Sequence, residues 1–139
     1  MSLIGILEDD AEGRIPRFRQ VLEELKVEAV FHDNAPDFLS WLDGNSAAVS
    51  LLSLDHDLGP TRERHGQPFD PGTGRTVSRR MIHMAPRFPV IVHSSNPLDG
   101  PAMVFDLESA GWRVLRLPPW GDEWIPTAWA RRVRELLGI

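Results

Sequence analysis

The stretch AVSLLSLDHDLG, residues 48–59, decides the fold, because an apolar run ends abruptly in Asp55, His56 and Asp57 and the chain then turns. An apolar run without alternation is typical of a strand covered on both faces, as in a parallel sheet. Amphipathic segments separate this run from four similar ones, at 3–7, 27–32, 88–95 and 112–117. The sequence therefore contains five candidate strands.

Five strands that alternate with helices predict an α/β fold, a three-layer sandwich around a doubly wound five-stranded parallel sheet with right-handed crossovers. A length of 139 residues suits one domain, and we expect a single domain over 1–139. The helices are expected within 8–26 and 33–44, around Val77–Met84, before Gly111, and over 127–137.

The composition restricts the classes of partner. A formal net charge of −5 argues against nucleic acid or an anionic membrane as partner, since both require a positive surface. No apolar run approaches the roughly 18 residues of a membrane span, and the start lacks a signal-peptide layout, so a cytoplasmic protein is expected. Because the chain has no cysteine, any metal must be held by oxygen or imidazole ligands. The oligomeric state is left open.

Acidic residues follow two of the strands, Glu8 and Asp9 after the first and Asp55 and Asp57 after the third. In such sheets ligands bind outside the carboxyl ends of the strands, where the strand order reverses. Two carboxylates about 4 Å apart repel by about 4 kcal/mol at an effective dielectric constant of 20, so three convergent ones must share a proton or a cation. Glu8, Asp9 and Asp55 are therefore candidate ligands for Mg²⁺ or Mn²⁺. The alternative is helix capping, which suits Asp10 best.

Three segments resemble the motifs of response-regulator receiver domains, in the same order: GILEDDAEGR (5–14), LLSLDHDLG (51–59) and FPVIVHSSNP (88–97). The resemblance implies a flavodoxin-like sheet with strand order 2-1-3-4-5. It also implies that Glu8 and Asp9 are the acidic pair that helps bind Mg²⁺ and that Asp55 is the phosphoacceptor. Ser94 matches the hydroxyl that contacts the phosphoryl group.

The chain also departs from ordinary receivers. These end strand five with a lysine that grips the phosphoryl group, whereas the only lysine here is Lys26, in the first helical segment. Arg116 could substitute, although a planar guanidinium is not equivalent to a compact ammonium. LDHDLG (54–59), Thr73-Gly74 and HSSNP (93–97) more closely resemble the cyclic-phosphate processing receiver-like proteins.

The leading hypothesis is thus a stand-alone receiver-like domain with a divalent-cation site that handles a phosphoryl group. Its ligand would be a cyclic phosphate or other small phosphate ester, and its activity a metal-dependent phosphoesterase type. Asp55 or a metal-activated water would attack phosphorus, and His93 or Asp57 would move protons. Candidate phosphate-binding residues are Ser94, Ser95, Thr73, Gly74 and Arg75. The alternatives are a signalling receiver phosphorylated on Asp55 by a phosphodonor kinase, and a degenerate receiver that serves as an interaction module.

Three further groups of residues allow a functional and a structural interpretation. The Gly- and Pro-rich segment after Asp57, which carries Arg62, Arg64 and His65, either closes over a phosphate-bearing ligand or is a solvated loop. His56 is interpreted as a packing or supporting residue, and His32, His65 and His83 as surface or loop residues. Trp120, Trp124 and Trp129 either cover the edge of the core, which we favour, or form a partner surface.

Overall fold

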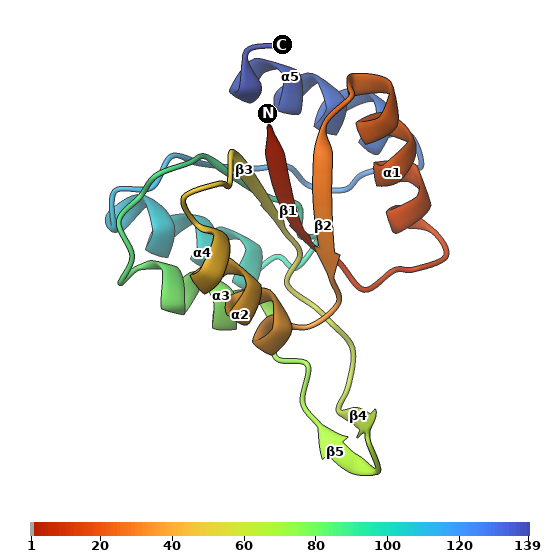
Figure 1. Ribbon diagram of the computed structural model, residues 1–139, viewed down its shortest axis with the longest axis vertical. Coiled ribbons are helices and arrows are strands. Elements are labelled where there is room, and N and C mark those ends of the chain that lie inside the picture. Colours follow the sequence, from red (N-terminus) through yellow and green to blue (C-terminus); the bar gives the residue numbers. More distant parts are fainter. Residues whose placement is uncertain (1) are drawn as a thin grey trace.

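The computed structural model describes residues 2–139 and has the expected α/β architecture (Figure 1). All neighbouring strands of the main sheet are parallel and lie in the order β2-β1-β3-β6-β7, which is 2-1-3-4-5 when only the strands of this sheet are numbered. The predicted fold class and strand order are confirmed. The strands are β1 (Leu3–Leu7), β2 (Glu28–His32), β3 (Leu51–Leu54), β6 (Val90–Val92) and β7 (Val114–Arg116).

Helices cover both faces of the sheet. One face packs under α1, the π-helical turn η1 and α5, around Phe18, Ile125 and Trp129. The opposite face packs under α2, α3 and α4, around Phe38 and Met103. The helices are α1 (Arg14–Leu25), α2 (Ala35–Asn45), α3 (Gly74–Met81), α4 (Asp99–Ser109), η1 (Ile125–Trp129) and α5 (Ala130–Leu137). None of the helices in residues 2–139 combines the length and the apolar character of a membrane span.

The segment predicted as an irregular loop contains a small antiparallel hairpin, formed by β4 (Arg62–Arg64) and β5 (Gln67–Phe69). His65 and Gly66 at its tip both have left-handed backbone angles, φ 55° and 76°, as in the two-residue turns that match the twist of paired strands. The hairpin extends beyond the carboxyl ends of β1 and β3 (Figure 1). It leaves and re-enters the fold at an antiparallel bridge between Asp57 and Thr73.

Two ion pairs attach this hairpin to the start of α2. Arg62 lies 2.9 Å from Asp33, and Arg64 lies 3.1 Å from Asp37. Both guanidinium groups also lie over the ring of Phe69. The arginines of the segment are thus engaged with α2 and with their own hairpin.

The tryptophans and His32 differ in part from their expected positions. Trp124 and Trp129 are buried under α1, as the core interpretation expects, but Trp120 is 80% exposed. His32 is half-buried, with its ring packed against Phe38 and Trp41, and is not a surface residue. It ends β2, where the face that carries α2 shelters it.

Asn34 is the N-cap of α2, and its buried side chain makes three hydrogen bonds. Its Oδ1 accepts from the Asp37 N–H at 2.8 Å, and its Nδ2 donates to Asp33 at 2.9 Å and to Asp37 at 3.1 Å. We expect Asn34→Ala to lower the free energy of unfolding by about 1–2 kcal/mol, the usual loss for a helix cap. Urea unfolding measures this loss, and exposed Ser40→Ala in the same helix is the control. An unchanged midpoint for Asn34→Ala would contradict the capping role.

Candidate functional site

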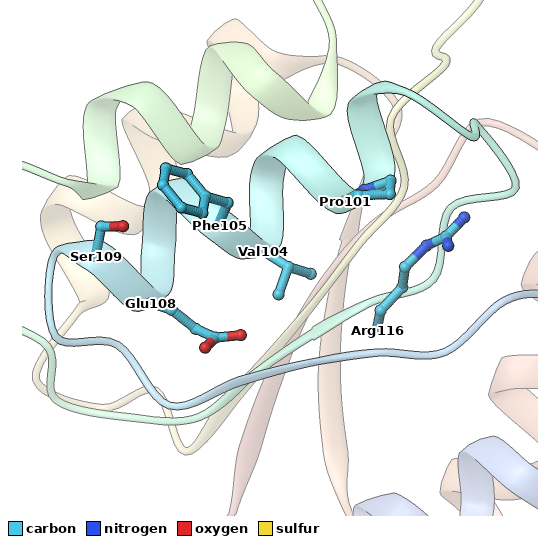
Figure 2. A pocket seen from close by; sticks show the side chains of 6 residues that line it. All are labelled: Pro101, Val104, Phe105, Glu108, Ser109 and Arg116. Carbon is cyan, nitrogen blue, oxygen red and sulfur yellow. The ribbon is translucent and has the colours of Figure 1, made fainter.

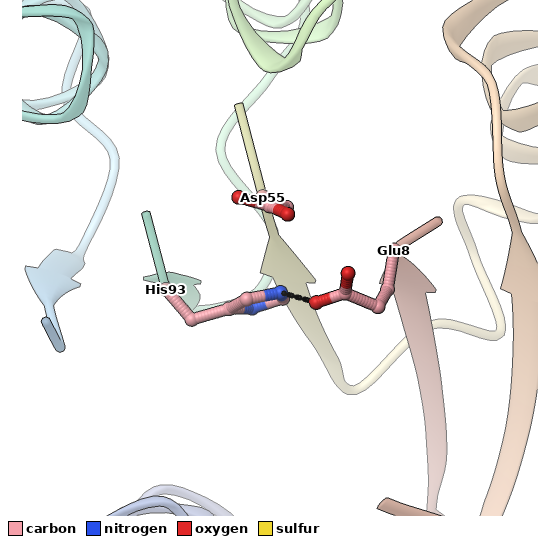
Figure 3. Close-up of side chains that lie close together, drawn as sticks. All are labelled: Glu8, Asp55 and His93. Carbon is pink, nitrogen blue, oxygen red and sulfur yellow. Dashed lines mark hydrogen bonds and ion pairs between the residues drawn. The ribbon is translucent and has the colours of Figure 1, made fainter. Parts of the chain in front are cut away.

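Glu8, Asp55 and His93 meet at the carboxyl ends of β1, β3 and β6 (Figure 3). One ligand atom of each side chain lies within 4.8 Å of the other two, and all three residues are buried. Nε2 of His93 lies 3.1 Å from Oε1 of Glu8, and Figure 3 shows Asp55 beside this pair. We call these three residues the acidic cluster.

The alternation of side chains along a strand explains why these residues meet. Ile4, Ile6 and Leu51 face the layer of α1 and α5, and so does Ile91. Glu8, Asp55 and His93 continue those same positions at even spacing, so they emerge on the same face at the sheet edge. Asp9 and Ser94 occupy the next positions and therefore emerge on the other side.

Glu8 is held as a carboxylate. Its Oε2 accepts the backbone N–H groups of Asp9 and Asp10, each at 3.1 Å, and its Oε1 faces His93 and Arg14. Burial by itself raises the pKa of Glu8, but the hydrogen bond to His93 and the charges of its neighbours outweigh that effect. The net result lowers the pKa from an ordinary value of 4.5 to about 2.

The pKa of Asp55 is shifted in the opposite direction. Burial raises its pKa from 3.8 to about 6, and the negative charge of Glu8 adds to the rise. His93, the N–H of His56 and the Arg14 guanidinium oppose this rise without cancelling it. The negative charge of ionised Asp55 is thus not fully balanced by its neighbours. A cation at this position would balance it.

Arg14 is a member of the site that the sequence analysis did not identify. It is the first residue of α1, and its NH1 lies 3.3 Å from Glu8 and 3.4 Å from Asp55. Asp10 fixes the start of this helix, because its carboxylate accepts the N–H groups of Gly13 and Arg14. This capping role of Asp10 is confirmed. The arrangement places the helix's first side chain directly over the strand ends.

Arg116, the candidate substitute for the missing lysine, contacts backbone carbonyls. Its NH2 donates to the backbone carbonyls of Ser94 and Asn96, each at 3.4 Å. The guanidinium also lies against Gly100 at the start of α4. The positive side chain that contacts Asp55 is therefore Arg14, which arrives from α1.

The other predicted catalytic and metal residues lie around the acidic cluster. Asp9 is half-buried beside it, and burial and the charge of Glu8 raise the pKa of Asp9. Asp57 is exposed and lies 2.9 Å from Nδ1 of His56, whose ring is buried. Ser94 is buried and its Oγ accepts the Asn96 N–H, while Ser95 is exposed. A catalytic role for Asp57 and a phosphate role for Ser94 or Ser95 remain predictions.

Thr73 and Gly74 have structural roles at the start of α3. The Gly74 N–H donates to the His56 carbonyl at 2.9 Å, and a Cβ at residue 74 would lie only 2.1 Å from the Asp55 carbonyl oxygen. Thr73 begins α3, and its N–H donates to Thr76. Arg75 pairs with Asp99 and Asp106 of α4, so phosphate binding by Arg75, which stays a prediction, would compete with these ion pairs.

Two hollows show where a small molecule could enter. Glu8 lines one of about 320 Å³ between the start of α1 and the β2–α2 turn, together with His32 and Asp33. Another, of about 520 Å³, lies between α4 and the end of β7, and Figure 2 shows Phe105, Val104 and Arg116 around it. Glu108 is the only carboxylate that lines this second hollow. The first hollow is therefore the one that leads to the acidic cluster.

The residues of the acidic cluster fit a divalent cation. Two carboxylates and one imidazole are ligands that Mn²⁺ accepts, and carboxylates with water are the usual ligands of Mg²⁺. One guanidinium, that of Arg14, faces two carboxylates, so the ionised site retains one negative charge. Glu8 and Asp55 are the residues that would hold the ion.

The comparison with known families agrees with this geometry. The sequence model of the cyclic-phosphate processing receiver domain matches residues 4–109, which includes the whole acidic cluster and Arg14. The chain belongs to this family. No curated protein shows a comparable similarity to the chain.

Solved structures with the same fold are receiver domains. A CheY-like receiver domain from Methanospirillum hungatei JF-1 is 15% identical, with a TM-score of 0.73 over 99% of this chain and 94% of that chain. A two-component response regulator from Clostridium difficile is 15% identical, with a TM-score of 0.68 over 99% and 97%. The phosphorylated cyanobacterial phytochrome response regulator RcpA is 17% identical, with a TM-score of 0.68 over 96% and 91%. These similarities show that the chain has the receiver fold.

Proposed function

We propose that the chain hydrolyses a small cyclic phosphate ester at the acidic cluster, with Mg²⁺ or Mn²⁺ held by Glu8 and Asp55. The observation that carries this proposal is the buried imidazole of His93, 3.1 Å from Glu8. A signalling site needs an acceptor carboxylate and a cation, but ring opening also needs a hydrogen-bond donor that stabilises the charge on the leaving oxygen. His93 supplies that additional group, and the family description is consistent with such a substrate.

Each residue of the cluster has a distinct task in this reaction. A bound divalent cation would neutralise phosphoryl oxygens and make phosphorus more electrophilic. Arg14 adds a second positive charge next to Glu8 and Asp55. His93 is buried against the rings of Phe18 and Trp124, which help to fix the direction of its Nε2. These residues are in place before the substrate binds, which limits the reorganisation that the reaction requires.

The ring-opening step is balanced in atoms and charge. Either water or the Asp55 carboxylate forms a bond to phosphorus, and the endocyclic P–O bond breaks. The leaving oxygen keeps the electron pair of that bond and accepts a hydrogen bond from Nε2–H of His93. With water as nucleophile, the proton that water loses passes to the leaving oxygen. With Asp55 as nucleophile, a second step with water releases the phosphate monoester and restores the carboxylate, and the proton that this water loses passes to the leaving oxygen.

We expect the protein to convert a cyclic phosphate into an open monoester in the presence of Mg²⁺ or Mn²⁺. Suitable probes are 2′,3′-cyclic AMP, with a five-membered ring, and 3′,5′-cyclic AMP, with a six-membered ring, followed by ³¹P NMR. Asp55→Asn and His93→Gln should each lower turnover by a factor of about 100 or more, the usual range for loss of a group that stabilises charge in the transition state. Asp43→Asn, an exposed acid paired with Arg80 on the far side of α2, is the matched control.

The signalling alternative gives a different result in the same protein. Acetyl phosphate with Mg²⁺ would then yield a stable adduct of one phosphoryl group, visible by intact-mass measurement and absent from Asp55→Asn. Such an adduct, together with no turnover of either cyclic probe, would contradict the proposed hydrolysis. The receiver fold and the position of Asp55 at the end of β3 make this the relevant alternative.

A further inference from the structure

Behind His93, on the side away from Glu8, buried polar groups form a hydrogen-bonded chain. The indole N–H of Trp129 donates to Oγ of Ser53 at 3.0 Å, and that Oγ lies 2.7 Å from Nδ1 of His93. The side chains of Ser53, His93 and Trp129 are all completely buried. On the front of the ring, Nε2 lies 3.1 Å from Oε1 of Glu8. Both nitrogens of His93 therefore have a defined partner.

The chemistry of these groups determines where the hydrogens lie. An indole N–H can only donate, so Trp129 occupies one lone pair of the Ser53 oxygen. Among residues 2–139 the only other hydrogen-bond partner of this hydroxyl is Nδ1 of His93. The Ser53 O–H therefore donates to Nδ1. A hydrogen on Nδ1 would leave the serine hydrogen buried without an acceptor, which is unfavourable.

The contact between Nε2 of His93 and Glu8 requires the same position of the imidazole hydrogen. Glu8 accepts the N–H groups of Asp9 and Asp10 at Oε2 and the Arg14 guanidinium at Oε1, so the hydrogen between Glu8 and the imidazole belongs on Nε2. We propose that Ser53 and Trp129 are positioning residues that hold His93 with its hydrogen on Nε2, so that it donates toward the acidic cluster and does not ligate the cation. Only the value of this arrangement for catalysis rests on the proposed function.

The residues of the acidic cluster would then have two different roles. A metal ligand must offer a free lone pair, so Nε2 could bind an ion only if its hydrogen moved to Nδ1. Ser53 and Trp129 oppose that move. The protein ligands of the cation are then carboxylates, and Nε2–H of His93 remains free to donate a hydrogen bond to the leaving oxygen.

Nitrogen NMR of ¹⁵N-histidine-labelled protein tests this inference directly. Long-range ¹H–¹⁵N correlation spectra, recorded at pH 8, distinguish the two neutral tautomers and the imidazolium. We expect His93 to carry its hydrogen on Nε2 alone, both without added metal and with 20 mM Mg²⁺. A hydrogen on Nδ1 in either sample would overturn the proposal.

Variants separate positioning from a merely structural role. Ser53→Ala removes the donor to Nδ1, and we expect the Nδ1–H fraction to rise about tenfold, as the loss of one buried hydrogen bond allows. Trp129→Phe keeps the serine but frees its hydroxyl to rotate, and should raise the same fraction. Ser53→Thr should restore the wild-type spectrum. Trp124→Phe is the control, because this indole packs on His93 without bonding Ser53.

Circular dichroism verifies that each variant is folded before its spectrum is interpreted. An unchanged tautomer ratio in folded Ser53→Ala and Trp129→Phe would overturn the inference. The readout is independent of activity, so the tautomer result stands even if neither cyclic probe is hydrolysed. A failure of the proposed function would instead appear as absent turnover with the Nε2–H tautomer intact.

Discussion

Glu8→Gln is expected to lower the free energy of unfolding by about 3 kcal/mol at pH 7 in metal-free buffer. The folded protein lowers the pKa of this buried carboxyl from 4.5 to about 2, and a difference of that size corresponds to about 3 kcal/mol. Because the folded pKa is the lower one, this stabilisation is fully present above pH 4.5 and is lost as the pH falls toward 2. The glutamine variant should lack this dependence.

Urea unfolding between pH 3 and pH 8, with EDTA present, measures the effect. Asp55→Asn provides a control of opposite sign, because the folded pKa of Asp55 is raised from 3.8 to about 6. Its contribution to stability is present below pH 3.8 and is lost as the pH rises through 6, so the asparagine variant should be more stable than wild type at pH 7. Equal stability of wild type and Glu8→Gln across this range would show that Glu8 is not held as a carboxylate.

Gly74→Ala should destabilise the protein by about 3 kcal/mol or more, at the upper end for overpacked sites. The new Cβ would lie 2.1 Å from the Asp55 carbonyl oxygen and 2.9 Å from the His56 Cα. Both are backbone atoms, so relief requires α3 to move away from the end of β3. The same movement would displace Asp55, and turnover should fall together with stability.

Gly44→Ala is the matched control for this substitution. Gly44 lies within α2, and a Cβ there meets no atom within 4 Å. Alanine should therefore be neutral or stabilise the helix by up to about 1 kcal/mol. Thermal unfolding of both variants, with cyclic-phosphate turnover measured on the same samples, checks the pair. A Gly74→Ala protein as stable as Gly44→Ala would mean that the close approach is not required.

The sequence was sufficient to predict the sheet and to single out all three residues of the acidic cluster. Buried parallel strands have continuous apolar runs, and the strand order followed from the receiver-like motifs. Alternation along β1 also carries Glu8 to the face shared with Asp55, although the sequence analysis grouped Asp9 with them. Consecutive residues at a strand end face opposite sides, which explains why Asp9 lies beside the acidic cluster and not within it.

Local sequence patterns could not predict the place of Arg14 in the site or the β4–β5 hairpin. The position of Arg14 depends on how α1 begins over the sheet, although the Asp10 cap fixes which residue starts the helix. The hairpin strands are short and mostly exposed, so they lack an apolar pattern. The dipeptide His65-Gly66 was the one available signal, since both residues take the left-handed angles of a tight turn.

The hairpin leaves and re-enters the fold at the Asp57–Thr73 bridge, and ion pairs with Asp33 and Asp37 also attach it. The chain between Gly59 and Pro71 can therefore be exchanged as a cassette, because its two ends already lie together and a new insert closes the same short gap. Leu58 and Pro71 are buried and belong to the framework that must be kept. Grafting other hairpins at this point would change the surface around the site, while the strands, the carboxylates and the imidazole keep their positions. The insertion is therefore a suitable place for engineering or for divergence of specificity.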